Sequence, residues 1–327
     1  ERVFTPWGDM EDEMRANGIP LYALESGDSV KDFDMIGFSG GYEMAYTAML
    51  NMLDLSGLPL RAADRPDLAP LVVAGGTAMY NAEPVADFID LALIGEGEDL
   101  VPEVVELYRK AKQEGWDKPR FLREAAQIQG VYVPALYDVQ YKEDGTIASI
   151  TPLEGAPAKV FKRVVHNMDK AYYPAKTIVP STEIVQDRVT LELFRGCIRG
   201  CRFCQAGMVY RPIREKSPET LCKNAKCLYE NTGYDEISLI SLSISDYSQI
   251  RELTDSLLSW TDNARVSLSL PSLRIDSFSE ELMEKISSVR TGGLTFAPEA
   301  GTQRLRDVIN KNVTEEDLMR AVSIAFR

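Results

Sequence analysis

Residues 190–204 read Thr-Leu-Glu-Leu-Phe-Arg-Gly-Cys-Ile-Arg-Gly-Cys-Arg-Phe-Cys, and this stretch decides the fold of the second half of the chain. Its first six residues predict a strand, and Cys197, Cys201 and Cys204 follow at the C-terminal end of that strand. Three thiolates so closely spaced on one loop can wrap a cubane iron-sulfur cluster and leave one iron without a protein ligand. The spacing therefore predicts an open, reactive iron site.

The residues between the cysteines suit such a loop. Gly196 and Gly200 permit the tight backbone path that brings three sulfur atoms together. Arg199 and Arg202 add positive charge beside ligands that must be thiolates.

All five cysteines lie between positions 197 and 227, which in an intracellular chain indicates metal or redox chemistry rather than a disulfide framework. A zinc site is the alternative, although zinc prefers four ligands, usually in two separated pairs, and no histidine lies nearby. Cys222 and Cys227 could in principle contribute ligands. Because they lie five positions apart in a predicted helix, they do not share a face well, and we interpret them as buried small apolar side chains.

The cysteine loop opens a series of alternating strands and helices. Such a series predicts part of a β/α barrel (a partial TIM barrel) over residues 188–327, C-terminally truncated, with its chemistry on the loops that follow the strands. The predicted strands cover residues 190–195, 236–243, 265–270 and 293–297, and the predicted helices cover 218–231, 247–260, 280–288 and 303–310, with a last helix from Thr314.

The N-terminal half has short apolar runs that alternate with helical patterns, which predicts a parallel sheet covered on both faces. We interpret residues 1–114 as a doubly wound, Rossmann-like α/β domain that is N-terminally incomplete, and residues 115–187 as a connector that contains a hairpin. The predicted strands of the domain cover residues 33–39, 71–76 and 91–95, and its predicted helices cover 44–55, 85–89 and 98–112.

The cysteine spacing, with Phe203 just before the third cysteine, resembles the radical S-adenosylmethionine (SAM) superfamily. The resemblance covers about residues 189–327 and implies a 4Fe-4S cluster held by Cys197, Cys201 and Cys204. It also implies that SAM chelates the open iron and is cleaved reductively to a 5′-deoxyadenosyl radical, with Phe203 near the adenine. A reductant such as flavodoxin or ferredoxin would supply the electron.

Four further residues are candidate SAM contacts by the same resemblance. Glu299, in the stretch 296–305, matches a strand-end motif whose carboxylate meets ribose hydroxyls or substrate. Ser243 and Asp246 stand where the superfamily often has a Gly-Gly-Glu that receives the SAM amino group. Arg274 could pair with a carboxylate, with a surface salt bridge as the alternative.

The N-terminal half resembles the cobalamin-binding domain often fused ahead of such barrels, and the whole chain resembles an uncharacterised radical SAM family with such a domain. Ser39, Gly40, Gly75 and Gly76 follow predicted strands, where glycine lets the backbone approach a cofactor closely. Cobalamin is therefore a candidate cofactor. The family's cobalt-binding histidine is missing, because the only histidine is His166.

Composition narrows the class of protein further. The chain has 327 residues and a formal net charge of −14, which gives no basis for binding nucleic acid or an anionic membrane. No apolar run approaches the ~20 residues of a membrane span, and the acidic N-terminus is not a signal peptide, so we expect a soluble, cytoplasmic protein. Because the first residue is glutamate, we treat the chain as a fragment.

Two other functions stay open. The first is a methylthiotransferase acting on RNA or protein, although those enzymes hold a second cluster in their N-terminal domain and this chain has no cysteine before position 197. The second is a regulatory or scaffold module that binds an iron-sulfur cluster or zinc without turnover.

Overall fold

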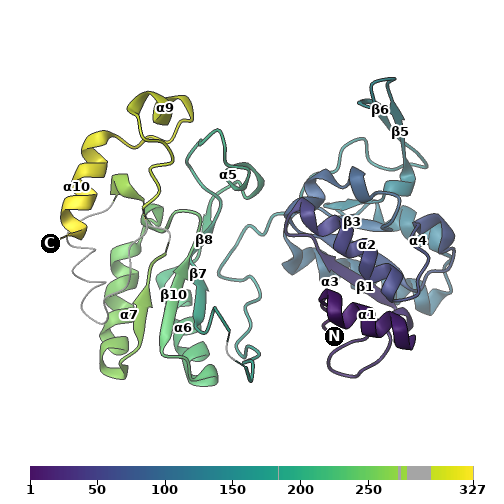
Figure 1. Ribbon diagram of the computed structural model, residues 1–327, viewed down its shortest axis with the longest axis horizontal. Coiled ribbons are helices and arrows are strands. Elements are labelled where there is room, and N and C mark those ends of the chain that lie inside the picture. The colour runs from purple at the N-terminus through teal and green to yellow at the C-terminus, as the bar shows by residue number, and fades with distance from the viewer. Residues whose placement is uncertain (183, 272–273, 278–295, 327) are drawn as a thin grey trace. The chain divides into compact units, whose positions relative to one another are not determined.

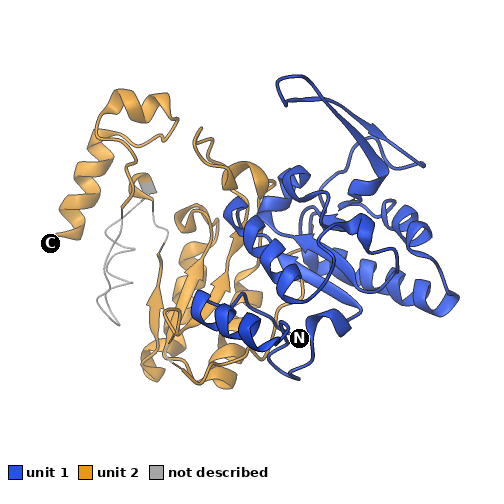
Figure 2. Cartoon of the chain, turned by 45° about the vertical axis from the view of Figure 1, so that its right-hand side comes forward, with its two compact units in different colours: residues 1–165 blue, residues 166–327 orange. Residues whose placement is uncertain are grey.

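The computed structural model describes residues 1–182, 184–271, 274–277 and 296–326. The chain divides into two compact units, unit 1 (Glu1–Val165) and unit 2 (His166–Arg327) (Figure 2). The segment 115–187, which the sequence set apart as a connector, is divided between them.

Unit 1 is built on a four-stranded sheet with the order β1-β2-β3-β4 (Figure 1). The first three strands, β1 (Met35–Ser39), β2 (Leu71–Gly75) and β3 (Leu91–Leu93), are parallel. The fourth strand, β4 (Val131–Tyr132), is antiparallel to β3. The strand order does not reverse within the described sheet, so the mixed α/β architecture agrees with the sequence but the doubly wound detail is not confirmed.

Both faces of this sheet are covered, as the continuous apolar sequence of β2 predicts. Alternate residues of β2 point to opposite faces: Val72 packs in the core beneath α2 (Tyr46–Leu55), and Val73 packs against α3 (Gly97–Glu114) and α4 (Lys118–Ala125). Both side chains are buried. Helix α4 was not predicted from the sequence, because proline, lysine and arginine interrupt its apolar positions.

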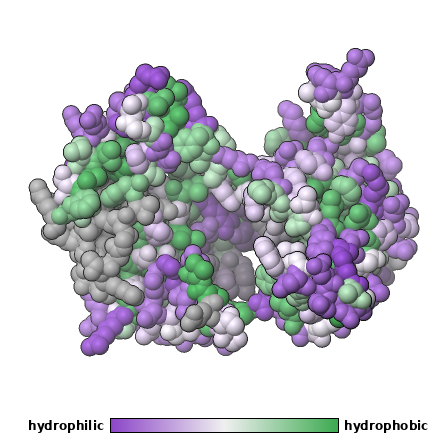
Figure 3. Space-filling view, in the orientation of Figure 1, coloured by the Kyte–Doolittle hydropathy of each residue, from purple (hydrophilic) through white to green (hydrophobic). Residues whose placement is uncertain are grey.

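The remaining elements of unit 1 are short. The predicted hairpin is confirmed as β5 (Tyr137–Tyr141) paired with β6 (Ile147–Pro152), and it projects with a largely hydrophilic surface (Figures 1 and 3). The helix predicted for residues 85–89 is wrong, since Pro84 begins only a 3₁₀ turn there, η5 (Glu83–Val85). The other elements are α1 (Gly8–Asn17), η1 (Val30–Asp32), η2 (Glu43–Ala45), η3 (Ala62–Asp64), η4 (Thr77–Asn81) and η6 (Pro134–Leu136).

A buried ion pair fastens α4 to the sheet of unit 1. The Asp90 carboxylate lies 2.8 Å from Lys118 Nζ, and its other oxygen accepts a 2.8 Å hydrogen bond from the backbone N–H of Val72. Lys118 also donates to the carbonyl oxygen of Arg65, at 2.6 Å. Both charged side chains are almost fully buried, so each depends on the other for its solvation.

Unit 2 contains a parallel three-stranded sheet with the order β11-β10-β7. Strands β7 (Val189–Glu192), β10 (Glu236–Ile240) and β11 (Ser267–Ser269) alternate with helices α6 (Pro218–Thr232) and α7 (Ile250–Ala264), as a β/α barrel segment requires. The helices cover one face through a single apolar core. The carboxyl ends of the strands therefore lie along one edge, as expected.

Some predicted boundaries in unit 2 differ from the structure. The strand predicted for 190–195 is interrupted at Leu193. The N–H of Leu193 makes the last hydrogen bond to β10, at Ile240, and the chain then changes partner as β8 (Phe194–Arg195), which pairs with β9 (Arg214–Glu215). The strand predicted for 236–243 ends at Ile240. The helix predicted for 280–288 and most of the strand 293–297 lie outside the described residues. The last elements are α5 (Ala206–Val209), η7 (Ile244–Asp246), η8 (Ile275–Ser277), α9 (Gln303–Val308) and α10 (Glu315–Ala325).

Within the part of the chain that the structure describes, no helix combines the length and the apolar character needed to cross a bilayer.

Candidate functional site

The three cysteines of the motif lie on one loop between β8 and α5, beyond the carboxyl end of β7. Cys197, Cys201 and Cys204 are all free thiols of intermediate burial. The backbone N–H of Cys204 donates to the carbonyl oxygen of Cys201 at 3.2 Å, which tightens the second half of the loop. Reactive groups thus stand at the strand-end edge where barrel chemistry is found.

The entry to this loop requires glycine. Gly196 has φ +90°, in the left-handed region, and a Cβ at this position would lie 2.7 Å from the carbonyl oxygen of Pro212. Any side chain would therefore both strain the backbone and collide with the strand that returns from the loop.

The three thiols could serve either an iron-sulfur cluster or a single metal ion. In the described residues, no three histidine, cysteine, aspartate or glutamate side chains are arranged to hold one metal ion. A zinc site needs its ligands to converge on a single ion. A cubane cluster needs one thiolate for each of three irons, so its ligands stay spread around the cluster. Cys222 is half-buried and packs against the core of unit 2, whereas Cys227 is half-buried but lies outside that core, so the prediction that both are buried is only partly right.

The turn after α9 holds the cysteine loop from one side. The backbone N–H of Arg202 donates to Ile309 at 3.0 Å, and Asn310 Nδ2 donates to the carbonyl oxygen of Gly200 at 2.8 Å. Thr302 caps the N-terminus of α9 by accepting a hydrogen bond from the N–H of Leu305.

Arg199 holds the loop from the other side. Its Nε and Nη2 atoms donate to the two oxygens of Asp246, at 2.9 and 2.5 Å, and its Nη1 atom lies 3.0 Å from Asp276 Oδ2. Ser243 Oγ donates to Asp246 Oδ2 at 2.7 Å. The hydrogen bond to Asp246 raises the pKa of Arg199. Burial alone would raise the pKa of Asp246, but the hydrogen bonds from Arg199 and Ser243 lower it, so this carboxylate stays ionised.

Arg274 completes this network of charges. It pairs with Asp276, with Nε 2.9 Å from Oδ1, and its Nη2 atom donates to the carbonyl oxygen of Lys311 at 3.1 Å. The backbone N–H of Arg274 donates to Ser245 Oγ at 3.3 Å. Arg274 thus forms the salt bridge that was the alternative to a contact with SAM, although this pair is largely buried and not on the surface.

The last two predicted contacts meet at Lys311. The ring of Phe203 is half exposed, and Lys311 Nζ lies 5.9 Å from its centroid. The same Nζ lies 3.1 Å from Glu299 Oε1. Glu299 has φ +67°, a conformation uncommon for a residue other than glycine or asparagine, and such strain is often found at functional sites.

The structure thus brings all five predicted SAM residues to the surroundings of the cysteine loop. Sequence reasoning missed Asp276, Asn310 and Lys311, which connect them. The sequence marks these three residues only as polar positions that follow an apolar segment. Such positions are common in any β/α protein. Arg199 was noted for its charge, but its partners could not be read from the sequence.

Three of the cobalamin candidates of unit 1, Ser39, Gly75 and Gly76, line a cavity of about 310 Å³ between the sheet and α3, and Gly40 is not among its lining residues. Gly76 has φ +102°, and a Cβ there would lie 2.5 Å from the carbonyl oxygen of Gly40. Gly40 itself donates to the carbonyl oxygen of Gly75 at 2.7 Å, so the loops after β1 and β2 are bound to each other. The cavity is lined by Met35, Gly37, Phe38, Ser39, Val73, Gly75, Gly76, Leu93, Gly95, Gly97, Val101 and Val104.

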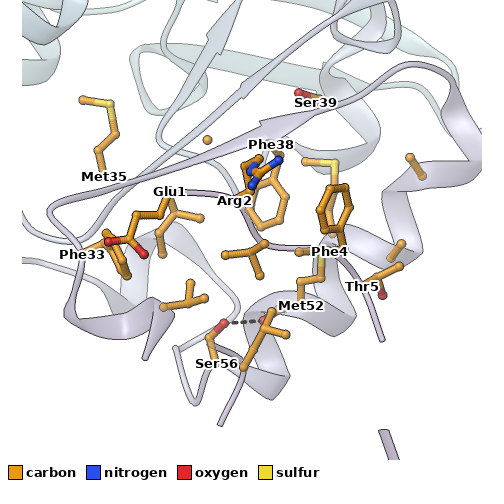
Figure 4. A pocket seen from close by; sticks show the side chains of 18 residues that line it. Glu1, Arg2, Phe4, Thr5, Phe33, Met35, Phe38, Ser39, Met52 and Ser56 are labelled. Carbon is orange, nitrogen blue, oxygen red and sulfur yellow. Dashed lines mark hydrogen bonds between the residues drawn. The ribbon is translucent and has the colours of Figure 1, made fainter. Parts of the chain in front are cut away.

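A larger cavity of about 590 Å³ in unit 1 lies between residues 1–5, β1 and α2. Phe4, Phe38 and Met52 are among the mostly apolar side chains around it, and Ser56 Oγ donates to the carbonyl oxygen of Met52 (Figure 4). Its described lining contains no group of metal ligands, and we assign no ligand to it.

Comparison with known families agrees with this architecture. Residues 1–134 match the family described as radical SAM proteins, N-terminal, and residues 191–327 match the radical SAM superfamily. The chain belongs to the radical SAM superfamily.

Its curated relatives are longer proteins. The chain is 31% identical over 309 residues to an uncharacterized protein of Methanocaldococcus jannaschii, which covers 94% of this chain and 59% of the relative. It is 24% identical over 144 residues to a putative methylthiotransferase of the same organism. This alignment covers 42% of this chain and 32% of the relative. The chain therefore spans at most about three fifths of these two relatives.

Solved structures share the fold across almost the whole chain. The radical SAM methyltransferase TsrM from Kitasatospora setae, with tryptophan and a SAM analogue bound, gives a TM-score of 0.59 at 14% identity and covers 98% of this chain and 57% of that one. The cobalamin-dependent radical SAM enzyme OxsB, with aqua-cobalamin and SAM bound, gives a TM-score of 0.59 at 14% identity. The match covers 98% of this chain and 41% of that one. At these identities the likeness establishes the fold.

Proposed function

We propose that this chain binds a 4Fe-4S cluster through Cys197, Cys201 and Cys204 and acts, with SAM at the fourth iron, as a radical SAM enzyme on a substrate not yet identified. The observation that carries the proposal is the set of three free cysteines on one fixed loop at the strand-end edge of a β/α sheet. When bound, the cluster and SAM supply a 5′-deoxyadenosyl radical that abstracts hydrogen from a substrate.

The residues of this chain have distinct proposed roles around that group. The exposed ring of Phe203 offers a surface for the adenine, and the carboxylate of Glu299 is available for ribose hydroxyls or substrate. Asp246 has both oxygens engaged by Arg199 and Ser243, so we assign it and Ser243 to shaping the site beside SAM. Arg274 acts in the same way through Asp276.

Unit 1 is proposed as a cobalamin-binding-like, doubly wound domain whose glycine-lined cavity accepts part of a corrinoid. The support is that the cavity, which lies between the sheet and α3, reaches Ser39, Gly75 and Gly76 at the carboxyl ends of β1 and β2, where such sheets bind ligands. TsrM and OxsB, which share the fold, carry cobalamin in their solved structures. The chain's only histidine, His166, belongs to unit 2, so unit 1 offers no imidazole to cobalt.

Anaerobic reconstitution with iron and sulfide tests the cluster. The full chain should bind about four irons and four sulfides, and Cys197→Ala, Cys201→Ala and Cys204→Ala should each lose most of them. Cys222→Ala is the matched control, because that thiol packs in the core and should leave iron content unchanged. Full iron content in any of the three loop variants would refute the assignment.

Reaction with SAM tests turnover. Reconstituted protein treated with dithionite and SAM should release 5′-deoxyadenosine. Release of none while the cluster is fully present would favour the module without turnover.

Methylthiotransfer is the second candidate, since the putative methylthiotransferase of Methanocaldococcus jannaschii is among the relatives. It predicts a second cluster, which would double the iron content to about eight per chain. All the cysteines of this chain lie between positions 197 and 227, so an iron content near four favours the first proposal.

A further inference from the structure

One ion pair joins the cysteine loop to a different strand end. Arg199 lies between the first two cysteines of the motif, and its guanidinium meets Asp246, which ends the turn η7 after β10, in a bidentate arrangement. Its third nitrogen reaches Asp276 in η8, in the segment that follows β11. A single side chain thus connects the loops that follow three neighbouring strands.

The network is shielded from water and balanced in charge. The exposed fractions are 23% for the Arg199 side chain, 7% for Asp246, 16% for Asp276 and 10% for Arg274. These four groups sum to zero net charge. Removing one of them leaves a partner buried without its counter-ion, which is more costly than losing an exposed salt bridge.

The contacts that hold the loop all come from the chain itself. The Arg199 side chain binds Asp246 and Asp276, and the carbonyl oxygen of the next residue, Gly200, is held by Asn310. Arg211 Nη2 adds a third contact, donating to the carbonyl oxygen of Arg199 at 3.0 Å. The backbone between Cys197 and Cys201 is therefore held by at least three contacts to other parts of the folded chain.

We propose that Arg199 and Asp246 form a positioning pair, which sets the cysteine loop in its cluster-binding arrangement before iron arrives and keeps a positive charge beside the cluster. The inference rests on the proposed function of the same loop. Groups that orient metal ligands from outside typically change metal retention about 10–100-fold when they are removed. Positive charge near an iron-sulfur cluster also favours its reduced form, because reduction adds an electron.

Three variants separate position from charge. Arg199→Gln removes the charge and both hydrogen bonds to Asp246, Asp246→Asn keeps Arg199 but weakens the pair, and Arg199→Lys keeps the charge without the bidentate contact. Arg188→Gln is the matched control, since Arg188 forms a similarly half-buried pair with Glu236 in the same sheet, at 2.6 Å.

Two readouts on reconstituted full chain test the pair. Iron release to a chelator should be about tenfold or more faster in Arg199→Gln and Asp246→Asn, and unchanged in Arg188→Gln. The midpoint potential of the cluster should become more negative in Arg199→Gln and stay near that of the wild type in Arg199→Lys. Release and potential at wild-type values in Arg199→Gln would overturn the inference.

A third readout needs no cluster. In the chain without iron, alkylation of Cys197 and Cys201, followed by mass spectrometry, should be faster in Asp246→Asn than in the wild type, since the loop is released. If circular dichroism shows that Arg199→Gln does not fold, Asp246→Asn and Arg199→Lys provide the test. Rates of alkylation and iron release equal to those of the wild type in both variants would refute the positioning pair. A wild-type chain that binds no cluster would instead refute the proposed function.

Discussion

The side-chain amide of Asn310 donates a 2.8 Å hydrogen bond to the carbonyl oxygen of Gly200, although 110 positions separate the two residues. A Cβ on Gly200 would lie 3.0 Å from the same amide nitrogen, so a side chain at position 200 would crowd Asn310. The turn after α9 is therefore part of the structure that holds the cysteine loop.

Loss of this amide should loosen the loop. Asn310→Gly removes the hydrogen bond but tolerates the φ of +55° at this position, and we expect alkylation of Cys201 in the iron-free chain to rise severalfold, since one hydrogen bond is worth about 1 kcal/mol. Asn312→Gly is the control, because Asn312 has φ +54° and is exposed. Equal rates in the two variants would contradict the role of Asn310.

Gly196 should not tolerate a side chain. Gly196→Ala combines a left-handed backbone with a Cβ 2.7 Å from a carbonyl oxygen, and we expect it to destabilise unit 2 by about 2–3 kcal/mol and to reduce iron content. Gly233→Ala carries the backbone penalty alone, since nothing lies within 4 Å of a Cβ there. Thermal unfolding and iron assays should therefore rank Gly196→Ala well below Gly233→Ala.

The buried ion pair of unit 1 should dominate its charge interactions. Asp90→Asn leaves Lys118 buried without its counter-ion, and we expect a loss of about 3–5 kcal/mol in the free energy of unfolding. Asp87→Asn breaks the exposed pair with Arg61 and should cost less than about 1 kcal/mol. Urea unfolding of both variants measures the difference, and similar losses would argue against the burial of Asp90.

The contribution of the Asp246 carboxylate to the stability of unit 2 should change with pH only under acidic conditions. The pKa of Asp246 is lowered in the folded chain, so the unfolded chain binds more protons once the pH falls to the ordinary aspartate pKa of about 4. The stabilisation is fully present above that pH and is lost as the pH falls through the folded pKa. The difference in unfolding free energy between wild type and Asp246→Asn should be constant from pH 7 to about pH 5 and shrink below about pH 4. A difference that already changes between pH 7 and 6 would contradict this origin.

A side chain at Gly76 should weaken the binding of a corrinoid in the 310 Å³ cavity of unit 1. Gly76→Ala places a Cβ 2.5 Å from Gly40 and forces the two strand-end loops apart, so we expect retention of hydroxocobalamin in gel filtration to fall at least tenfold. Gly57→Ala has a comparable φ of +70° with open space around it, and its retention should match that of the wild type. A wild-type chain that retains no corrinoid would refute the proposed cofactor of unit 1 and leave the cluster proposal intact.

Much of the fold could be predicted because local patterns carry it. The continuous apolar run of β2 shows a strand buried on both faces, and α6 begins at Pro218 with Ser217 as its cap, as its sequence indicates. The predictions failed where tertiary contacts override local preference. Strand 190–195 breaks at Leu193 because β10 ends at Ile240 and the next residues pair with β9 instead, and β4 joins the first sheet through only two residues.

The amino-acid sequence by itself determined the candidate metal ligands of this protein: three cysteines on one loop, at the end of a strand, in a series of β/α units. Spacing along the chain is sufficient for that conclusion, because the ligands are neighbours in the sequence. Only the tertiary structure decided how the loop is held, by Asn310 and by the pair of Arg199 with Asp246. Asp246 and Asn310 lie 47 and 110 positions away from the loop residues that they contact, and charged residues at strand ends look alike until the sheet brings particular ones within hydrogen-bond distance.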